Sequence, residues 1–271
     1  MTFVGKINKI QDKNKSLLCI GLDSDIDKIP ASIRRTKNPQ LEFNKKIIDA
    51  TKDLVCAYKL NLAFYESAGK LYYETIHKTL EGIPKNIITI ADGKRSDIGN
   101  TAEQYAKIIF GDWKFDAATV NPYMGYDSIE PFIRSEKHCA FLLALTSNQG
   151  SKDFQYLNVK GRPLYEHVVA KAIKWNELKN IGLVVGATHP QELKRIRTMA
   201  PDIPFLIPGI GTQQGDIEAT IRYGCRKNGK MALVNISRAI IFKSDKKDFA
   251  EKARESAMSF VKQFNQYRHV K

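Results

Sequence analysis

The sequence predicts an α/β protein with a (β/α)8 TIM barrel as its single domain. Eight short apolar runs recur along the chain, and each ends in glycine or polar residues. Amphipathic segments separate the runs. Polar side chains suited to chemistry gather directly after the runs, which is where the active sites of such barrels lie. These three observations together favour a closed barrel with one functional face.

The eight apolar runs are expected to be strands. Continuous apolar residues, rather than a strict alternation with polar residues, are typical of strands that are buried on both faces of a parallel sheet. In chain order the expected strands are residues 17–23, 55–61, 86–94, 117–123, 141–147, 182–188, 205–211 and 231–238.

The segments between the runs are expected to be helices. Residues 100–110 open with an asparagine that can cap a helix, and apolar residues then recur at helical spacing. Residues 164–175 and 250–264 show a similar pattern. The chain therefore alternates strand and helix, as a parallel barrel requires.

The chain length fits one large domain. Its 271 residues, of which 43% are hydrophobic, are expected to form a single domain over residues 1–271, with residues 1–16 and 265–271 as terminal extensions. A doubly wound open sheet is the alternative, and it would normally carry a Gly-x-Gly-x-x-Gly turn after an early strand. The first run instead leads into Gly21-Leu22-Asp23, so the closed barrel is favoured.

Charge and hydropathy narrow the class of partner. The net charge is +14, but the basic residues are scattered and do not interleave with aromatic residues, so nucleic-acid binding is not favoured. A basic surface of this kind mildly favours anionic substrates. No apolar stretch approaches the roughly 20 residues that span a bilayer, and the N-terminus lacks the pattern of a signal peptide. We therefore expect a soluble, cytoplasmic protein without a membrane partner.

The spacing of cysteines and histidines predicts neither a metal site nor a disulfide framework. Cys19, Cys56, Cys139 and Cys225 form no Cys-x-x-Cys pair and are expected to be small buried residues in the reduced state. The five histidines are dispersed along the chain. Ser147 has no apparent base and orienting group, which argues against a hydrolase triad.

A charged array is predicted at the third strand. Asp92 and Lys94 are two residues apart on it, so their side chains project to the same face. Lys59 on the neighbouring strand can join them, and Asp97 follows three residues after Lys94. Two lysines and two aspartates in alternation can all stay charged, because each has opposite neighbours. A purely structural ion-pair network is the alternative, but burying charges for stability alone is poorly repaid.

A phosphate site is predicted after the last two strands. The seventh run leads into Gly209, Gly211 and Gln213, and the eighth leads into Ser237 and Arg238. Loops after strands seven and eight form the usual phosphate site of such barrels. Glycines expose backbone N–H groups, and arginine offers a planar fork to phosphate oxygens. The glycine-rich segment alone could be only a tight turn, but Arg238 makes a phosphate site the favoured interpretation.

Short motifs stand in order along the predicted barrel. The Asp-x-Lys-x-x-Asp signature occupies residues 92–97. It is accompanied by CIGLD at 19–23, YKLN at 58–61, NTA at 100–102, LALTSN at 143–148, PGIGTQQGD at 208–216 and NISRAI at 235–240. Together these motifs resemble the orotidine 5′-phosphate decarboxylase family. VNPYMGYDSIEPF at 120–132 and VVGATHPQEL at 184–193 are similar to its longer bacterial subgroup, type 2.

The resemblance implies decarboxylation of orotidine 5′-monophosphate to uridine 5′-monophosphate in de novo pyrimidine biosynthesis, without a cofactor. It implies that Lys94 protonates C6 of the pyrimidine after CO2 leaves, and that Asp92 lies beside the substrate carboxylate. Lys59 and Asp97 would complete the charged array and contact ribose hydroxyls.

The resemblance also implies the residues that bind the substrate. Asp23 would bind the ribose and Ser147 the pyrimidine. Gln213 and Arg238 would hold the phosphate. Ser237 stands where short-form relatives often have glycine.

Asp97 and Thr101 would reach into the site of a partner subunit, so the resemblance implies a homodimer with shared active sites. The alternative in the same superfamily is a Mg²⁺-dependent sugar-phosphate decarboxylase or aldol-type synthase, which shares the Asp-x-Lys-x-x-Asp motif. The context of Lys59 and the LTSN and GTQQGD segments favour the nucleotide decarboxylase. A catalytically inactive binding protein is disfavoured, because every charged residue of the array is present.

Overall fold

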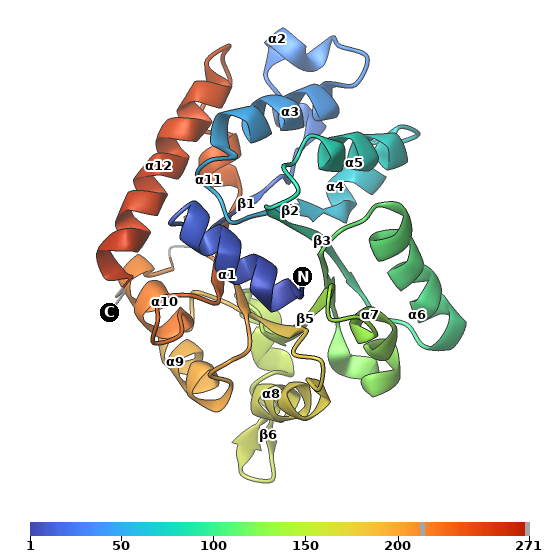
Figure 1. The fold of residues 1–271 in the computed structure, drawn as a ribbon, viewed down its shortest axis with the longest axis vertical. Coiled ribbons are helices and arrows are strands. Elements are labelled where there is room, and N and C mark those ends of the chain that lie inside the picture. The colour runs from blue at the N-terminus through green and yellow to red at the C-terminus, as the bar shows by residue number, and fades with distance from the viewer. Residues whose placement is uncertain (212–214, 269–271) are drawn as a thin grey trace.

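Eight parallel strands close into a barrel in the computed structural model, which describes residues 1–211 and 215–268. Around the barrel the strands follow the order β1-β10-β9-β8-β5-β4-β3-β2, and helices form a ring outside them (Figure 1). The predicted TIM barrel is confirmed, and each predicted run overlaps one strand. The strands are β1 (Leu18–Gly21), β2 (Ala57–Asn61), β3 (Ile88–Arg95), β4 (Ala117–Val120), β5 (Cys139–Leu145), β8 (Ile181–Val185), β9 (Phe205–Pro208) and β10 (Ala232–Ile236).

Most strands end earlier than the apolar runs predicted. The run at 117–123 is an example, because β4 stops at Val120 and the chain turns at Asn121. The side chain of Asn121 accepts a hydrogen bond from the backbone N–H of Tyr123 and so caps a 3-10 turn at Pro122–Met124. Asparagine competes with the sheet for backbone N–H groups in this way. The polar ends of the runs therefore belong to loops, where they can meet a ligand.

The predicted helices are present, with shifted ends. Residues 100–110 correspond to α6 (Gly99–Ala106) and a π-helical turn at Lys107–Asp112. Helix α8 (Leu164–Trp175) matches its prediction, and α12 (Phe249–Tyr267) is longer than predicted. The other helices are α1 (Phe3–Lys13), α2 (Ala31–Arg34), α3 (Pro39–Thr51), α4 (Leu62–Glu66), α5 (Tyr72–Glu81), α7 (Glu130–Ile133), α9 (Pro190–Met199), α10 (Ile217–Gly224) and α11 (Arg238–Ile241).

Residues 1–16 contain helix α1, which lies across one opening of the barrel (Figure 1). Its residues Phe3 and Ile7 are buried, and the ring of Phe3 packs edge-on against Phe141 of β5. The side-chain amide of Gln11 donates a hydrogen bond of 2.7 Å to the backbone carbonyl of Ala232. This amphipathic helix therefore adds to the core and covers the end of the barrel where the strands begin.

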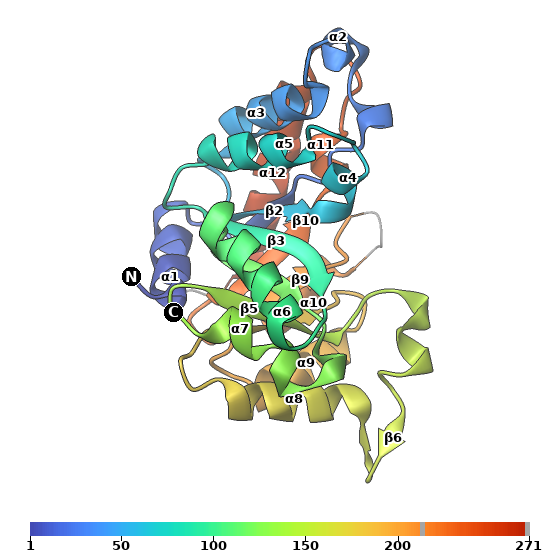
Figure 2. The same cartoon turned by 90° about the vertical axis from the view of Figure 1, so that its right-hand side faces the viewer.

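The segment between β5 and α8 carries a short hairpin that the sequence did not predict. Strands β6 (Asn158–Val159) and β7 (Arg162–Pro163) pair antiparallel and project from the barrel (Figure 2). Figure 2 shows this hairpin and α1 on opposite sides of the barrel. The hairpin therefore belongs to the face where the parallel strands end.

The four cysteines are buried and unpaired, as predicted. Burial raises the pKa of each of these thiols, so the thiolate form is disfavoured. Among the helices of the described ranges, none combines the length and the apolar character needed to cross a membrane.

Candidate active site

Four charged side chains meet where the first three strands end. Asp23 follows β1, Lys59 lies on β2, and Asp92 and Lys94 lie on β3. In the parallel register Asn61 lies beside Asp92, and Lys59 is two residues before Asn61. Side chains two residues apart on a strand share a face, so Lys59 and Asp92 project to the same side of the sheet.

The carboxylate of Asp92 is at the centre of this cluster. One of its oxygens accepts a hydrogen bond of 2.8 Å from Nζ of Lys59, and the other accepts one of 2.8 Å from Nζ of Lys94. Nζ of Lys59 also lies 3.4 Å from a carboxylate oxygen of Asp23. The charges therefore alternate along the row Asp23, Lys59, Asp92, Lys94.

Thr119 on β4 completes the cluster, and sequence reasoning missed it. Its hydroxyl donates a hydrogen bond of 2.8 Å to Asp92 and accepts one of 3.0 Å from the backbone N–H of Lys94. Lys94 has a φ of +45°, a conformation that L residues rarely adopt. The sequence did contain a sign of this role, because Thr119 is the one polar residue within the four-residue strand β4.

The cluster keeps its buried members charged. Burial would raise the pKa of Asp92, but the ammonium groups of Lys59 and Lys94 outweigh burial and hold that pKa well below its usual range. Burial would lower the pKa of Lys59, but Asp23 and Asp92 outweigh it and raise that pKa. Lys59 and Asp92 therefore form a buried ion pair at neutral pH.

Lys94 differs from Lys59 in its exposure. The side chain of Lys94 is 49% exposed, whereas that of Lys59 is 6% exposed. Lys94 can therefore approach a bound molecule while Asp92 holds its ammonium group in place. Lys59 is largely enclosed, with its ammonium group between the carboxylates of Asp23 and Asp92.

Asp97 and Thr101 are not drawn into the cluster of their own chain. Asp97 lies in the loop before α6, where its carboxylate accepts a hydrogen bond of 2.9 Å from the backbone N–H of Ile98. Within residues 1–211 and 215–268 it makes no ion pair. Thr101 is exposed on α6. Within the chain, Asp23 rather than Asp97 is therefore the second aspartate of the row.

The predicted phosphate residues lie after β9 and β10. Gly209 and Gly211 have φ values of +112° and +92°, which glycine adopts readily. Ser237 precedes α11, and its hydroxyl donates a hydrogen bond of 3.0 Å to the carbonyl of Gly21. Arg238, the first residue of α11, is exposed. Gln213 falls outside the described residues.

Ser147 follows β5, on the side of the barrel opposite β1 and β2 in strand order. It is partly buried, and its backbone packs closely against Gly186 after β8. A Cβ atom on Gly186 would lie only 2.9 Å from Cα of Ser147. Glycine at 186 therefore permits the contact between these two loops.

Comparisons with known proteins place this barrel in a family. The family model described as "Orotidine 5'-phosphate decarboxylase / HUMPS family" matches residues 16–253. The chain belongs to this family. A curated relative named orotidine 5′-phosphate decarboxylase, from Dehalococcoides mccartyi, is 48% identical over 272 residues, which cover 99% of both chains.

Two solved structures from Leishmania donovani share the fold of the present chain. The structure of the Leishmania donovani OMP decarboxylase has a TM-score of 0.87 and 36% identity, with 99% of both chains covered. The UMP synthase of the same organism has a TM-score of 0.88 and 37% identity over 99% of the present chain. The present chain spans 57% of the length of that UMP synthase.

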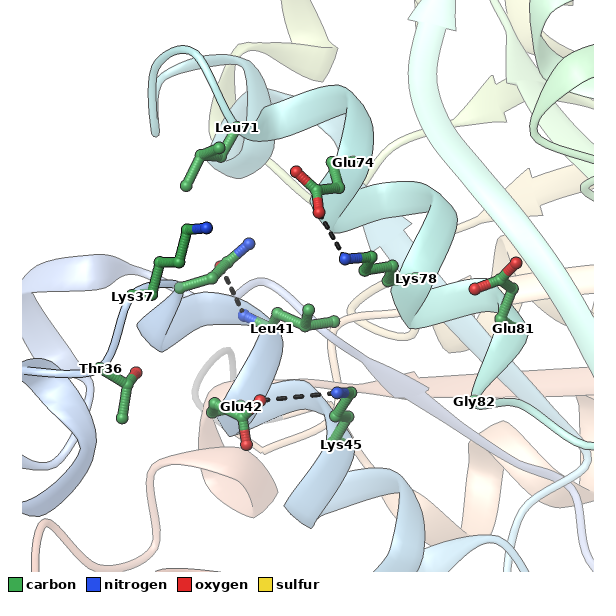
Figure 3. Close-up of a pocket in the computed structure, with 11 residues that line it drawn as sticks. Thr36, Lys37, Leu41, Glu42, Lys45, Leu71, Glu74, Lys78, Glu81 and Gly82 are labelled. Carbon is green, nitrogen blue, oxygen red and sulfur yellow. Dashed lines mark hydrogen bonds and ion pairs between the residues drawn. The ribbon is translucent and has the colours of Figure 1, made fainter.

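A hollow between α3 and α5 lies apart from the strand ends of this decarboxylase-family barrel (Figure 3). Four of its charged side chains form two ion pairs, Lys78 with Glu74 and Lys45 with Glu42. These are partners three or four residues apart on single helices, which is common on a solvated surface. The hollow therefore lacks the converging, buried charges of the Asp92 cluster.

The carboxylate of Asp92 is surrounded by hydrogen-bond donors of the protein, which suits ammonium groups better than a metal ion. One carboxylate oxygen accepts hydrogen bonds from both Lys94 and Thr119, and the other accepts one from Lys59. A divalent cation bound to Asp92 would have to displace these donors and would be repelled by two ammonium groups. The cluster of this family member is thus built to present a cation from the protein itself.

Proposed function

We propose that this chain is a carboxy-lyase that converts orotidine 5′-monophosphate to uridine 5′-monophosphate in de novo pyrimidine biosynthesis. The observation that carries the proposal is the partly exposed ammonium group of Lys94, held 2.8 Å from the buried carboxylate of Asp92. Membership of the orotidine 5′-phosphate decarboxylase / HUMPS family supports it.

The chemistry requires stabilisation of a carbanion without a cofactor. When the bond between C6 and the carboxylate breaks, its electron pair stays on C6 and CO2 leaves. Lys94 would stabilise this developing charge and then donate a proton from Nζ to C6. Asp92 is charged and sits beside Lys94, so it would repel the substrate carboxylate until that carboxylate becomes neutral CO2.

The remaining residues would bind the nucleotide. Asp23 would contact the ribose and Ser147 the pyrimidine. Gln213 and Arg238 would hold the phosphate, with backbone N–H groups near Gly209 and Gly211 and with Ser237. Lys59 would keep Asp92 charged and contact a ribose hydroxyl. Phosphate binding at a distance from C6 supplies binding energy that can orient the reacting ring.

The activity itself is the first test of this function. We expect purified protein to consume orotidine 5′-monophosphate, followed as a loss of its ultraviolet absorbance, and to do so equally well in excess EDTA. Strict dependence on added Mg²⁺, with turnover of a sugar phosphate instead, would favour the Mg²⁺-dependent sugar-phosphate decarboxylases and aldol-type synthases of the same superfamily and would contradict the proposal.

We also propose that two chains form a homodimer with shared active sites in the cytoplasm, without a nucleic-acid or membrane partner. Asp97 and Thr101 lie outside the cluster of their own chain, where they are available to the neighbouring site. Ile98, next to Asp97, is 50% exposed, and Tyr123 in the loop after β4 is 85% exposed. A partner subunit seated over this end of the barrel would cover such apolar side chains.

Mixing two inactive variants tests the shared site. If Asp97 serves the partner's site, a heterodimer of Lys94→Ala and Asp97→Ala chains has one intact site and one that lacks both groups. Random exchange of subunits should then restore about a quarter of the unmodified activity. If Asp97 serves its own site, mixing the two variants restores nothing. The readout is the rate of orotidine 5′-monophosphate loss before and after subunit exchange.

A further inference from the structure

Every polar group of Thr146 is engaged by side chains from two loops. Thr146 follows β5 and precedes Ser147, the residue to which we assign the pyrimidine. Its N–H, hydroxyl and carbonyl all have partners within the described residues. None of these partners belongs to the charged cluster around Asp92, so they form a separate structural feature. We call Gln155, Tyr156, His189 and Glu192 the Thr146 brace.

Gln155 holds Thr146 at two points. Its side-chain carbonyl accepts a hydrogen bond of 2.8 Å from the backbone N–H of Thr146, and its amide nitrogen donates one of 2.8 Å to the Thr146 hydroxyl. That hydroxyl donates in turn to the side chain of Asn148 at 2.6 Å. The backbone of Gln155 is itself fixed by bonds of 2.9 Å with Ser151 and Tyr165, at the start of α8. Gln155, which holds Thr146 at two points, is therefore itself held in place by backbone hydrogen bonds.

His189 holds the carbonyl of Thr146 from the loop after β8. Nε2 of His189 lies 3.2 Å from that carbonyl, and because a carbonyl only accepts, Nε2 must carry the hydrogen. Nδ1 lies 3.3 Å from the hydroxyl of Tyr156, which donates to Glu192 on α9 at 3.0 Å. Burial and the hydrogen bond to Glu192 raise the pKa of Tyr156, so this hydroxyl stays protonated. With the imidazole hydrogen on Nε2 and the Tyr156 hydrogen directed to Glu192, no hydrogen lies between Nδ1 and Tyr156. That side of the imidazole is held by packing, with the Tyr156 and His189 rings edge to face and their centroids 6.0 Å apart.

Fixing Thr146 also fixes Ser147. The carbonyl of Thr146 and the N–H of Ser147 belong to one planar peptide unit, so His189 sets the direction of that N–H. On its other side, the carbonyl of Ser147 accepts a hydrogen bond of 3.5 Å from the Thr188 hydroxyl, and Gly186 packs against its backbone. Two loops that are far apart in the sequence therefore determine where Ser147 stands.

We propose that Gln155 and His189 are positioning residues, which hold the Thr146–Ser147 peptide so that Ser147 meets the substrate base in a fixed orientation. The inference rests on the proposed function, because it takes Ser147 as the contact to the pyrimidine. A site gains rate when the residues that orient the substrate are held by a second set of hydrogen bonds, since small misplacements slow the reaction. Neither residue needs to touch the substrate for this role.

Near-isosteric variants test the brace. We expect Gln155→Leu and His189→Leu each to lower kcat/KM for orotidine 5′-monophosphate by about 10- to 100-fold. His189→Gln keeps a donor near the position of Nε2 and should recover most of that loss. Inhibition by ribose 5-phosphate, which has no base, should change by less than about twofold in all three variants. The matched control is His167→Leu, because Nε2 of His167 also lies at hydrogen-bond distance, 2.8 Å, from a backbone carbonyl, that of Val159 in the hairpin; this change should leave kcat/KM unaltered.

The outcomes separate this inference from the proposed function. No turnover by the unmodified chain would overturn the proposed function, and the inference with it. Normal kcat/KM in both leucine variants of an active enzyme would overturn the inference alone. Equal weakening of ribose 5-phosphate and orotidine 5′-monophosphate, without recovery in His189→Gln, would mean that the residues only stabilise the fold. Urea unfolding of each variant identifies that case.

Discussion

Replacing Lys94 by alanine is expected to lower the turnover of orotidine 5′-monophosphate by about 10⁴-fold. The variant loses both the cation that faces the developing charge on C6 and the proton that C6 must receive. Asp92 keeps its hydrogen bonds with Lys59 and Thr119, so the buried carboxylate stays paired. Because the side chain of Lys94 is 49% exposed, the fold should survive its removal.

The comparison for Lys94→Ala is Lys114→Ala. Lys114 also has a positive φ, +63°, and is exposed, but it precedes β4 and so lies at the end of the barrel away from the cluster. The Lys114→Ala variant should keep its full activity. This control separates the chemical role of Lys94 from any loss of stability caused by alanine at a positive φ. Absorbance assays give the rates, and calorimetric titration with uridine 5′-monophosphate checks that the phosphate site still binds. Turnover by Lys94→Ala within tenfold of the unmodified chain would contradict the proton-donor role.

The sequence was sufficient to predict the barrel and the pairing of Asp92 with Lys94 and Lys59. Continuous apolar runs carry the strand signal, because both faces of these strands are buried. The two-residue period of a strand places Asp92 and Lys94 on one face without further information. The ends of strands were less certain, since residues such as Asn121 can either extend a run or cap a turn.

Proximity across loops was not predictable from the sequence. Asp97 is close to Lys94 in the chain, yet it does not join the cluster of its own chain. The aspartate that approaches Lys59 is Asp23, which is 36 residues away in the sequence. Gln155 and His189 meet at Thr146 only because the loops after β5 and β8 lie on adjacent strands. Such contacts depend on loop conformation, which apolar periodicity does not specify. Thr119, by contrast, was visible as a polar residue inside an apolar strand.

Replacing Lys59 by methionine should destabilise the protein by about 3–5 kcal/mol at neutral pH, because it leaves a buried carboxylate with one cation fewer. Methionine has a similar length, so little volume is lost. Lys59 and Asp92 are both buried, so water cannot easily take the place of the ammonium group. Urea unfolding followed by circular dichroism measures the change. Lys78→Met, which breaks an exposed pair with Glu74 on α5, should leave the free energy of unfolding nearly unchanged.

The loss in Lys59→Met should shrink as the pH falls. In the unmodified chain the pKa of Asp92 is depressed, so its contribution to stability is present above the ordinary carboxyl pKa of about 4 and is lost as the pH falls further. Without Lys59, the pKa of Asp92 in the folded state is higher than in the unmodified chain, so the same fall in pH costs the variant less stability than it costs the unmodified chain. Adding Asp92→Asn to the variant should recover part of the loss at pH 7, because the uncompensated charge is gone. A loss that is the same at pH 7 and pH 4 would mean that packing around Lys59, rather than its charge, stabilises the end of the barrel.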